Sequence, residues 1–532
     1  MGKRDISIAI SDILITIIII LTIINRETSL DFVSMWKYGI IILLYLFIRL
    51  FAKTYKFSVL WGIVVIGLME AVIAFLQKIY VLDSNHTSFE ITGTFTNPSQ
   101  LAGLLCVCLT ICVGLLFYYI DKRLRLFILI LVVCAGMMFI AILLSDSRAS
   151  LLASIIGLIS LCYLYNRYVR DFIKNNEKFI SMKAVVLLVL IVSIWGLYQH
   201  KKDSADGRLF IWNNTIEMIK EKPILGYGTG GWVANYMYYQ ADYFKEYPDS
   251  DYRMLADDVA YPYNELLHLW VDQGIIGVSL IICLLYNLLF YKSSNKLNAI
   301  LKCALVSFVV FSFFSYPTDT FGLMILLCVL MGSLDSRIIF VYPIPKVFFY
   351  SNFISVFLLI GFLSLWSYHI YEKTLSELFK PERQVRSEMK TTFLDLNYTS
   401  FCNNPYVMDL YAQYSFKYYS SEKAERILQS AICLRPSSDL YCNIGDVYKA
   451  QKKYSVAEGC YQIAGHMIPA RITPNYNLFI LYVEQNDSIN ALKIGNAILC
   501  QATKVEGTKT LKMKANVMQF VESCNSVSLL KN

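Results

Sequence analysis

Apolar runs long enough to cross a lipid bilayer recur between residues 6 and 369, and they constrain the fold more than any other feature. A helix needs about 20 mostly apolar residues to span the hydrocarbon layer, and most of these runs have about 16 to 24. They lie near 6–24, 39–52, 58–77, 99–119, 126–144, 149–165, 184–199, 270–290, 298–315, 320–334 and 347–369. We therefore predict an all-α, polytopic membrane helix bundle of about eleven spans.

The composition excludes an ordinary soluble domain. Hydrophobic residues make up 56% of the chain and charged residues 17%, whereas soluble domains carry about 25% charged residues. The first apolar run follows Lys3 and Arg4 but lacks a small-residue cleavage site, so we expect a retained helix instead of a signal peptide. The 14 cysteines contain no close CxxC pair, so we expect no zinc site, and those in the apolar runs should act as small hydrophobes.

The distribution of basic residues predicts the topology, because short loops rich in lysine and arginine stay in the cytoplasm. One set of alternate loops holds Lys3, Arg4, Arg49, Lys53, Lys56, Lys122, Arg123, Arg125, Arg167, Arg170, Lys174, Lys178, Lys183, Lys292, Lys296, Arg337 and Lys346. The opposite set holds little beyond Arg26, Lys37, Lys78 and Arg148. We predict a multi-pass membrane protein with a cytoplasmic N-terminus. The net charge of +8 then reflects topology, and no nucleic-acid surface is expected.

From about residue 400 the composition changes to that of soluble helices with tetratricopeptide spacing. The positions that match one repeat are Tyr441, Ile444, Gly445, Tyr448, Ala457, Tyr461, Ala464 and Pro469. The preceding repeat is marked by Ala424, Leu428, Ala431 and Pro436, and a weaker third by Tyr482 and Ala491. We predict a tetratricopeptide-like domain over 400–532, outside the membrane, that binds a protein partner, with a charged helical linker over 372–399. The alternative is an ordinary bundle of helical hairpins.

The segment 200–262 is too long and too polar for a simple connection, and long loops in compact domains are usually functional. Aromatic residues and isoleucines at helical spacing up to Lys222 suggest a helix on the outer membrane face. The glycines that follow, Gly226, Gly228, Gly230 and Gly231, do not form a nucleotide loop, because no strand precedes them and no Gly-Lys-Ser/Thr follows. We expect them to turn the chain and to leave backbone N–H groups available to an anion.

Five short elements resemble the O-antigen ligase and polymerase superfamily, over roughly residues 60–335. They are the Arg208-aromatic-Trp212 element, the turn Pro223-Ile224-Leu225-Gly226-Tyr227-Gly228-Thr229-Gly230, the helix from Asn264 to Gly274-Ile275-Ile276-Gly277, Gly93-Thr94-Phe95-Thr96-Asn97-Pro98, and Ser147-Arg148. The resemblance implies an O-antigen-ligase-like membrane domain over 1–371 with its large outer loop at 200–262. Such enzymes move a glycan from undecaprenyl pyrophosphate to an acceptor hydroxyl outside the cytoplasmic membrane, and they need no cofactor and no metal.

The resemblance assigns site residues by position. Arg208 and Arg148 match family arginines, and arginine suits the growing charge of a departing pyrophosphate. The alternatives are a surface or headgroup arginine for Arg208 and a snorkelling one for Arg148. Asn97 and Asn264 match family asparagines and are expected to contact substrate. Ligases commonly have a histidine just before the latter asparagine, but this chain has Tyr263 there.

Two residues near that position are candidate bases. His268 lies one helical turn beyond Asn264, on the same face, and is a candidate to replace the family histidine in part. Glu265 is the other candidate, against the alternative of a solvated carboxylate at a helix start. A good leaving group also lowers the need for any base.

One glutamate and one group of aspartates are further candidates. Glu70 lies inside an apolar run, where a carboxylate is a functional candidate by default; the alternative is a buried hydrogen bond between helices. The acidic residues Asp249, Asp251, Asp257 and Asp258 match no metal-binding motif, so we favour a solvated loop over a divalent-cation site.

We therefore expect a glycosyltransferase that acts on membrane lipid, with a lipid-linked glycan donor and lipid A core or a protein hydroxyl as acceptor. Two sub-classes remain open beside the ligase: a polysaccharide polymerase and a protein O-oligosaccharyltransferase. An alternative of another class is a transporter or a membrane-anchored scaffold that acts through its repeats. A transporter should show paired broken helices in two related halves, and the sequence shows none.

Overall fold

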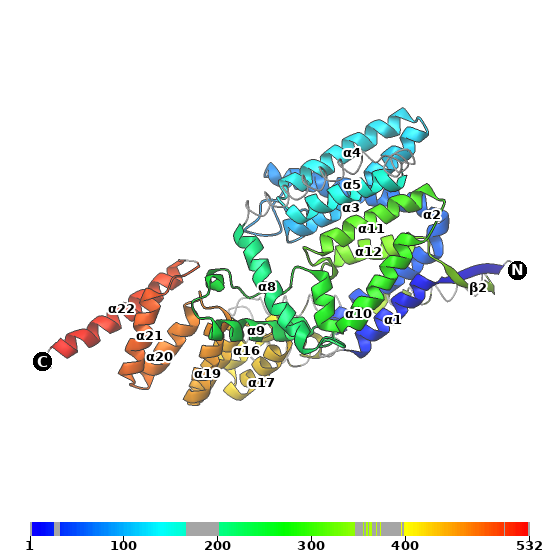
Figure 1. Ribbon diagram of the computed structural model, residues 1–532. Helices are drawn as coiled ribbons and strands as arrows, with labels where there is room; N and C mark the ends of the chain where they lie inside the picture. The colour runs from blue at the N-terminus through cyan, green and yellow to red at the C-terminus, as the bar shows by residue number, and fades with distance from the viewer. Residues whose placement is uncertain are drawn as a thin grey trace.

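The computed structural model describes residues 3–25, 32–165, 202–345, 398–504 and 506–529, with scattered positions between 355 and 395. Its apolar helices are α1 (Ile10–Ile24), α2 (Phe32–Lys78), α3 (Pro98–Asp121), α4 (Arg125–Leu144), α5 (Arg148–Tyr165), α10 (Glu265–Phe290), α11 (Lys296–Ser312) and α12 (Phe321–Ser333). They form one bundle (Figure 1). The all-α expectation is confirmed apart from one small sheet.

Five of the described helices are long and apolar enough to cross a membrane: Tyr55–Lys78, Pro98–Asp121, Arg125–Leu144, Arg148–Tyr165 and Glu265–Phe290. Shorter apolar helices are Ile10–Ile24, Tyr38–Phe51 and Phe321–Ser333. The expected spans near 184–199 and 347–369 lie outside the described residues, apart from isolated positions in the second. The count of eleven therefore stays a prediction.

The centre of the bundle is α3, in which every residue from Leu101 to Cys112 is buried. It packs against α2, α4, α5, α11 and α12. Thr110 on α3 and Ser307 on α11 join their hydroxyls at 2.8 Å. A Cβ at Gly157 on α5 would lie 1.8 Å from the Ser307 hydroxyl, so only glycine lets the three helices approach this closely. The cysteines of α3 are free and largely buried, as expected for small hydrophobes.

Two expectations about the first runs are wrong. The first run does not begin as a helix: β1 (Lys3–Ala9) pairs antiparallel with β2 (Ile338–Pro345), and α1 starts only at Ile10. The pairing gives hydrogen-bond partners to backbone N–H and C=O groups of both segments, which lie outside any helix. The second and third runs are not separated by a loop, because α2 continues through both and is divided only by a kink at Tyr55.

Polar contacts place several basic turns at one end of the bundle. Arg49 lies 2.9 Å from Asp12 at the start of α1, and Lys56 lies 2.8 Å from Asp335 just after α12. Ser293, between α10 and α11, donates to the same Asp335 at 2.7 Å. These contacts place the kink of α2, the α10–α11 connection and the segment after α12 at one end of the bundle. The side of the membrane on which this end lies stays a prediction.

The opposite end carries the large polar segment. Asn25, directly after α1, donates to the carbonyl of Leu225 at 2.7 Å and accepts from the amide of Thr229 at 2.9 Å. The segment consists of α8 (Lys202–Glu221), a glycine turn, α9 (Gly231–Glu246), the 3-10 helix η1 (Asp251–Met254) and an extended stretch that leads into α10. The expected helix before the glycines is confirmed as α8. Whether it lies on a membrane is not tested by the structure.

The C-terminal part is a row of antiparallel helix pairs. The pairs are α16 (Pro405–Tyr418) with α17 (Ser421–Leu434), α18 (Ser438–Ala450) with α19 (Tyr454–Met467), and α20 (Thr473–Glu484) with α21 (Ser488–Cys500), followed by α22 (Thr508–Leu529). Short α15 (Tyr398–Phe401) precedes them. The small and aromatic positions Ala457, Tyr461 and Ala464 are fully buried. The geometry is compatible with three tetratricopeptide-like repeats, although their assignment to that family stays a prediction.

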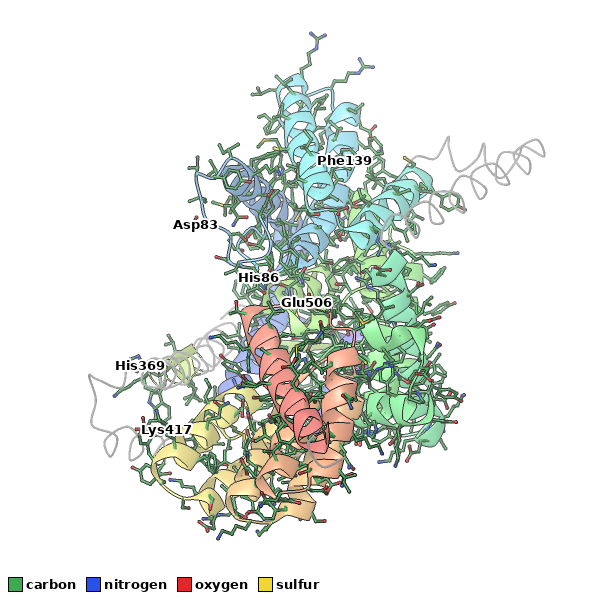
Figure 2. The ribbon with its side chains drawn as sticks, turned by 90° about the vertical axis from the view of Figure 1, so that its left-hand side faces the viewer. Asp83, His86, Phe139, His369, Lys417 and Glu506 are labelled. Atoms are coloured by element: carbon green, nitrogen blue, oxygen red, sulfur yellow. The ribbon has the colours of Figure 1, made fainter. Side chains whose placement is uncertain are left out.

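The membrane bundle and the C-terminal helices occupy different parts of the molecule in two views (Figures 1 and 2). In Figure 1, α8 and α9 lie between the membrane bundle and the C-terminal helices. In Figure 2, turned by 90°, Phe139 on α4 lies in the upper part of the molecule and Lys417 on α16 in the lower part. Most of the expected linker 372–399 lies outside the described residues.

Candidate active site

Arg208 projects from α8 towards the loop that follows α11. Its Nη1 donates to the carbonyl of Phe314 at 2.9 Å, and its guanidinium lies 5.1 Å from the ring centre of Tyr263. Burial lowers the pKa of Arg208, and so does the nearby charge of Arg148, while Tyr263 and Tyr316 act in the opposite direction. An arginine stays charged in proteins. No carboxylate among the described residues is seen to pair with it. The guanidinium instead contacts the Phe314 carbonyl and the Tyr263 ring.

Three tyrosines form the wall beside Arg208. Tyr261 stacks on Tyr316 with ring centres 4.2 Å apart, and Tyr263 meets the same ring edge-on at 5.5 Å. Asn97 donates from Nδ2 to the Tyr316 hydroxyl at 3.2 Å. The expected site residues Asn97, Tyr263 and Arg208 are therefore brought together, and Tyr316, which the sequence analysis missed, lies at their centre.

The two asparagines also have structural roles. Asn97 accepts from the amide of Ser99 at 2.8 Å and caps α3. Asn264 accepts from the amides of Leu266 and Leu267 at 3.0 and 3.1 Å and caps α10. Asn264 thus stabilises the start of α10, and contact between Asn264 and substrate stays a prediction.

Arg148 begins α5, close enough to lower the pKa of Arg208 by charge repulsion. Its Nη2 lies 3.5 Å from the hydroxyl of Ser204 on α8. Two cations from different helices thus face one region, which is the arrangement expected around an anionic group such as a pyrophosphate.

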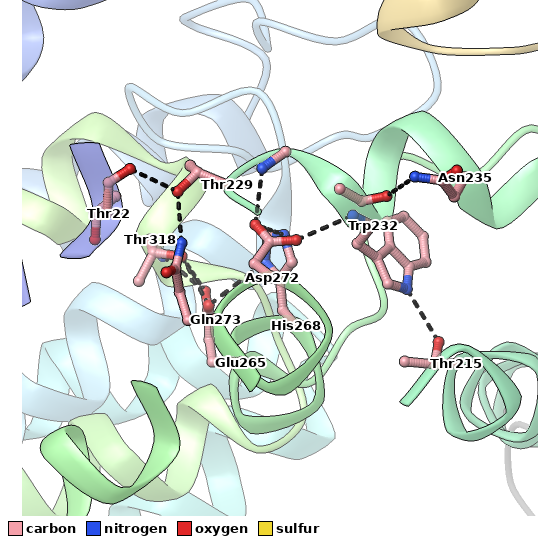
Figure 3. Close-up of polar contacts among 12 residues, drawn as sticks. Thr22, Thr215, Thr229, Trp232, Asn235, Glu265, His268, Asp272, Gln273 and Thr318 are labelled. Atoms are coloured by element: carbon pink, nitrogen blue, oxygen red, sulfur yellow. Dashed lines mark hydrogen bonds and ion pairs between the residues drawn. The ribbon is translucent and has the colours of Figure 1, made fainter. Parts of the chain in front are cut away.

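A second cluster, acidic with one histidine, adjoins the first. Glu265 accepts from the amide and the hydroxyl of Thr318 at 2.8 and 2.7 Å. His268 lies between two carboxylates, with Nδ1 3.8 Å from Glu265 and Nε2 3.7 Å from Asp272 (Figure 3). Desolvation raises the pKa of Asp319 to about 6, and the charges of Glu265 and Asp272 add to this while His268 opposes it.

The glycine turn is built around Asp272. Gly226, Gly228 and Gly230 all have positive φ, as expected for residues that turn the chain. Asp272 accepts from the amides of Gly230 at 2.9 Å and Trp232 at 3.0 Å, and so caps α9 (Figure 3). The amides of Gly228 and Gly231 donate to the backbone carbonyls of Asp272 and Gly228. The expectation that the glycine amides are available to an external anion is therefore wrong for Gly228, Gly230 and Gly231, which already have internal acceptors.

Glu70 contacts the loop that precedes Asn97. Its carboxylate accepts from the amide and the hydroxyl of Thr94 at 3.0 and 2.5 Å. A Cβ at Gly93 would lie 2.3 Å from Glu70, so the glycine permits this contact. Glu70 therefore joins α2 to the loop that leads into Asn97. This contact favours a structural role for Glu70 over direct contact with substrate.

No group of three or more metal-ligating side chains occurs among the described residues, the acidic loop included. The expectation of a solvated loop is incomplete. Asp257 pairs with Arg471 and Lys504, and Asp258 pairs with Arg435. These three cations come from the C-terminal helices.

Comparison with known proteins matches residues 133–282 to the family "O-Antigen ligase". Residues 133–282, within the membrane part of the chain, thus resemble the O-antigen ligase superfamily. The matched range holds Arg148, Arg208, Tyr263, Glu265 and His268. The match supports the expected superfamily, and the apolar helices indicate an integral membrane protein.

Curated relatives match this chain over a stretch similar in length to the family match. Proteins of Rickettsia conorii and Rickettsia felis, each named "Putative polysaccharide ligase", are 33% identical over 124 residues and 32% identical over 123 residues. Each match covers 22% of this chain, and 28% or 29% of the relative. The chain thus matches less than a third of the length of these relatives. No solved structure matches it significantly.

Two residues of the site lie beyond the family match and were missed from the sequence. Tyr316 and Asp319 belong to the short polar stretch between α11 and α12. A signal was present, because a tyrosine, a proline and an aspartate interrupt two apolar runs on the same side as the large loop. Asp272 was noted only as part of the α10 motif.

Proposed function

We propose that the protein is a membrane glycosyltransferase that moves a glycan from undecaprenyl pyrophosphate to an acceptor hydroxyl on the outer side of the bacterial inner membrane. The acceptor is lipid A core or a protein hydroxyl. The N-terminus is cytoplasmic in this proposal, and the C-terminal helices, which adjoin the large polar segment, lie outside.

The observation that carries the proposal is the position of Arg208. Negative charge grows on the pyrophosphate as the glycosidic bond breaks, and a fixed cation that needs no rearrangement stabilises that charge most. Arg208 is fixed by the Phe314 carbonyl and the Tyr263 ring, and Arg148 lies near it. A planar guanidinium can donate two parallel hydrogen bonds to a phosphate.

The acidic cluster deprotonates and orients the acceptor hydroxyl in this proposal. The acceptor hydroxyl must lose a proton as its oxygen attacks the anomeric carbon of the glycan, and undecaprenyl pyrophosphate leaves with the electrons of the broken bond. Glu265 is already bound by Thr318, and His268 is flanked by carboxylates that favour its charged form. Asp319 is the carboxyl of the group whose pKa is raised to about 6, chiefly by desolvation. In this proposal Asp319 takes the proton, and Glu265 and His268 orient the acceptor.

The test is transfer by the purified full-length protein in lipid nanodiscs, given an undecaprenyl-pyrophosphate-linked oligosaccharide and candidate acceptors. Arg208→Ala should lower kcat by about 10²- to 10³-fold, the loss typical of one charge-stabilising donor. Arg208→Lys should be intermediate, because lysine keeps the charge but not the planar fork. Arg253→Ala is the matched control, since that arginine lies on η1 with a 41% exposed side chain.

The outcomes separate the remaining functions. Transfer to an added lipid or protein acceptor names the ligase sub-class. A glycan ladder that grows without an acceptor identifies a polymerase. If neither the wild type nor the control acts on any authentic donor and acceptor, the scaffold or transporter hypothesis replaces the enzyme.

A further inference from the structure

The C-terminal helices dock on the segment that carries the site, and the docking surface is defined by side chains. Gln240 on α9 donates to the backbone carbonyl of Met467 at 2.7 Å, in a buried position. The hydroxyls of Tyr238 and Tyr441 lie 3.0 Å apart. Met467 and Ile468 belong to the same apolar cluster as the core of α9. The contact therefore combines buried apolar surface with specific polar bonds.

Beside α9, three cations of the C-terminal part converge on two adjacent carboxylates. Arg435 follows α17 and lies 3.3 Å from Asp258. Arg471 precedes α20, Lys504 follows α21, and they lie 3.4 and 2.9 Å from Asp257. The Asp258 side chain is 20% exposed, so its pair with Arg435 is the best shielded of the three. Shielded pairs are less weakened by solvent than exposed ones.

The carboxylates stand directly before the tyrosines of the site. Residues 257–264 form no helix or strand, so side-chain contacts must fix their path. Two such contacts come from the outer segment itself: Gln240 donates to the carbonyl of Asp257 at 3.1 Å, and Trp212 donates to that of Pro262 at 2.8 Å. Further contacts are those of the Tyr261 and Tyr263 rings with Tyr316, and the ion pairs to the C-terminal part.

The electrostatic field of this interface reaches the site. Burial raises the pKa of Tyr261, the charge of Asp319 adds to it, and the charge of Arg435 lowers it. Burial also raises the pKa of Tyr263, which Arg208 lowers and Asp257 raises. Arg435 and Asp257 therefore lie within electrostatic range of the tyrosines that contact Tyr316 and Arg208.

We propose that the C-terminal helical domain is a positioning element of the transferase site: Arg435, through Asp258, holds the stretch 257–264 so that Tyr261 and Tyr263 stay against Tyr316 and Arg208. Arg435 is a positioning residue and not a catalytic one, because it contacts Asp258 and not the reacting groups. The proposal rests on the proposed function for its catalytic consequence, but not for its structural one. A domain that served only to recruit a partner would not need this contact.

The experiment compares Arg435→Gln with Lys449→Gln in the full-length protein. Lys449 is the matched control, because it pairs with Glu484 at 3.2 Å within the C-terminal helices, away from the loop. The first readout is hydrogen exchange of the peptide that covers 255–264. The second is the kcat and the KM for the lipid-linked donor. Arg435→Gln should accelerate exchange of that peptide and lower kcat by about tenfold, with KM changed by less than about threefold, since a small misplacement mainly costs rate. Lys449→Gln should change neither.

Rescue separates positioning from general instability. The charge-swapped pair Asp258→Arg with Arg435→Asp should restore slow exchange and most of the kcat, whereas each single reversal should not. Unchanged exchange and unchanged kcat in Arg435→Gln would overturn the proposal, as would a loss that the swap fails to repair in a protein that still unfolds cooperatively. A wild type without transfer activity overturns the proposed function instead, and the exchange data alone then decide whether the domain fixes the loop.

Discussion

Replacing Asp272 by asparagine tests whether this carboxylate organises the outer end of the bundle. Its two oxygens accept from the amides of Gly230 and Trp232 at 2.9 and 3.0 Å, and its side chain is only 11% exposed. In Asp272→Asn one oxygen becomes an NH₂ group, so one buried amide donor faces another donor. Such an unsatisfied donor costs about 1–3 kcal/mol. Loss of the negative charge at the start of α9 costs about 0.3–1 kcal/mol more.

The expected loss of folding stability is therefore about 1–4 kcal/mol. Equilibrium unfolding of the purified protein in mixed micelles measures it, followed by the fluorescence of the buried Trp232. Asp249→Asn makes the same chemical change at a carboxylate that is 99% exposed, and should alter stability by no more than about 0.5 kcal/mol. If the two variants are equally stable, the reasoning about Asp272 is refuted. If Asp272→Asn is destabilised as expected, the carboxylate is an internal anion of the glycine turn.

Two further predictions follow from the same end of the bundle. Gly274 has φ +62°, and a Cβ there would lie 2.0 Å from the carbonyl oxygen of Ile224, so Gly274→Ala should lose at least about 2 kcal/mol in the same unfolding assay; Gly207→Ala, with nothing within 4 Å, should be neutral or slightly stabilising. Because the pKa of Asp319 is raised to about 6 in the folded protein, the protein binds more protons folded than unfolded and should lose stability as pH rises from about 4 through about 6. Asp319→Asn should remove that dependence, and a persisting slope would contradict the assignment.

The membrane bundle was predictable because its signal is local. Each of α3, α4 and α5 is a long apolar run, and a backbone in lipid must satisfy its own hydrogen bonds, so helices were the expected outcome. The strand β1 was missed because its signal is short: Ile6 and Ile8 alternate with Asp5 and Ser7, but a strand needs a partner. That partner is β2, more than 300 residues further along the chain.

The site was predictable only in part, for a related reason. Arg208, Arg148 and Asn97 were found through the resemblance to a family, and the structure brings Arg208 near both Arg148 and the tyrosine bonded to Asn97. Tyr316 was missed because its role depends on contacts with residues 219 and 55 positions away, Asn97 and Tyr261. No local pattern marks such a residue.

The missed contacts share one physical cause, which also explains the arrangement of the site. The stretch 257–264 and the glycine turn have little secondary structure of their own, so their backbone positions depend on bonds from other elements. Asp272 on α10 fixes the turn and the start of α9, and α9 in turn carries the contact with Met467. A site built from such segments needs support from both sides. The membrane bundle supplies one side through Phe314 and Tyr316, and the C-terminal helices supply the other.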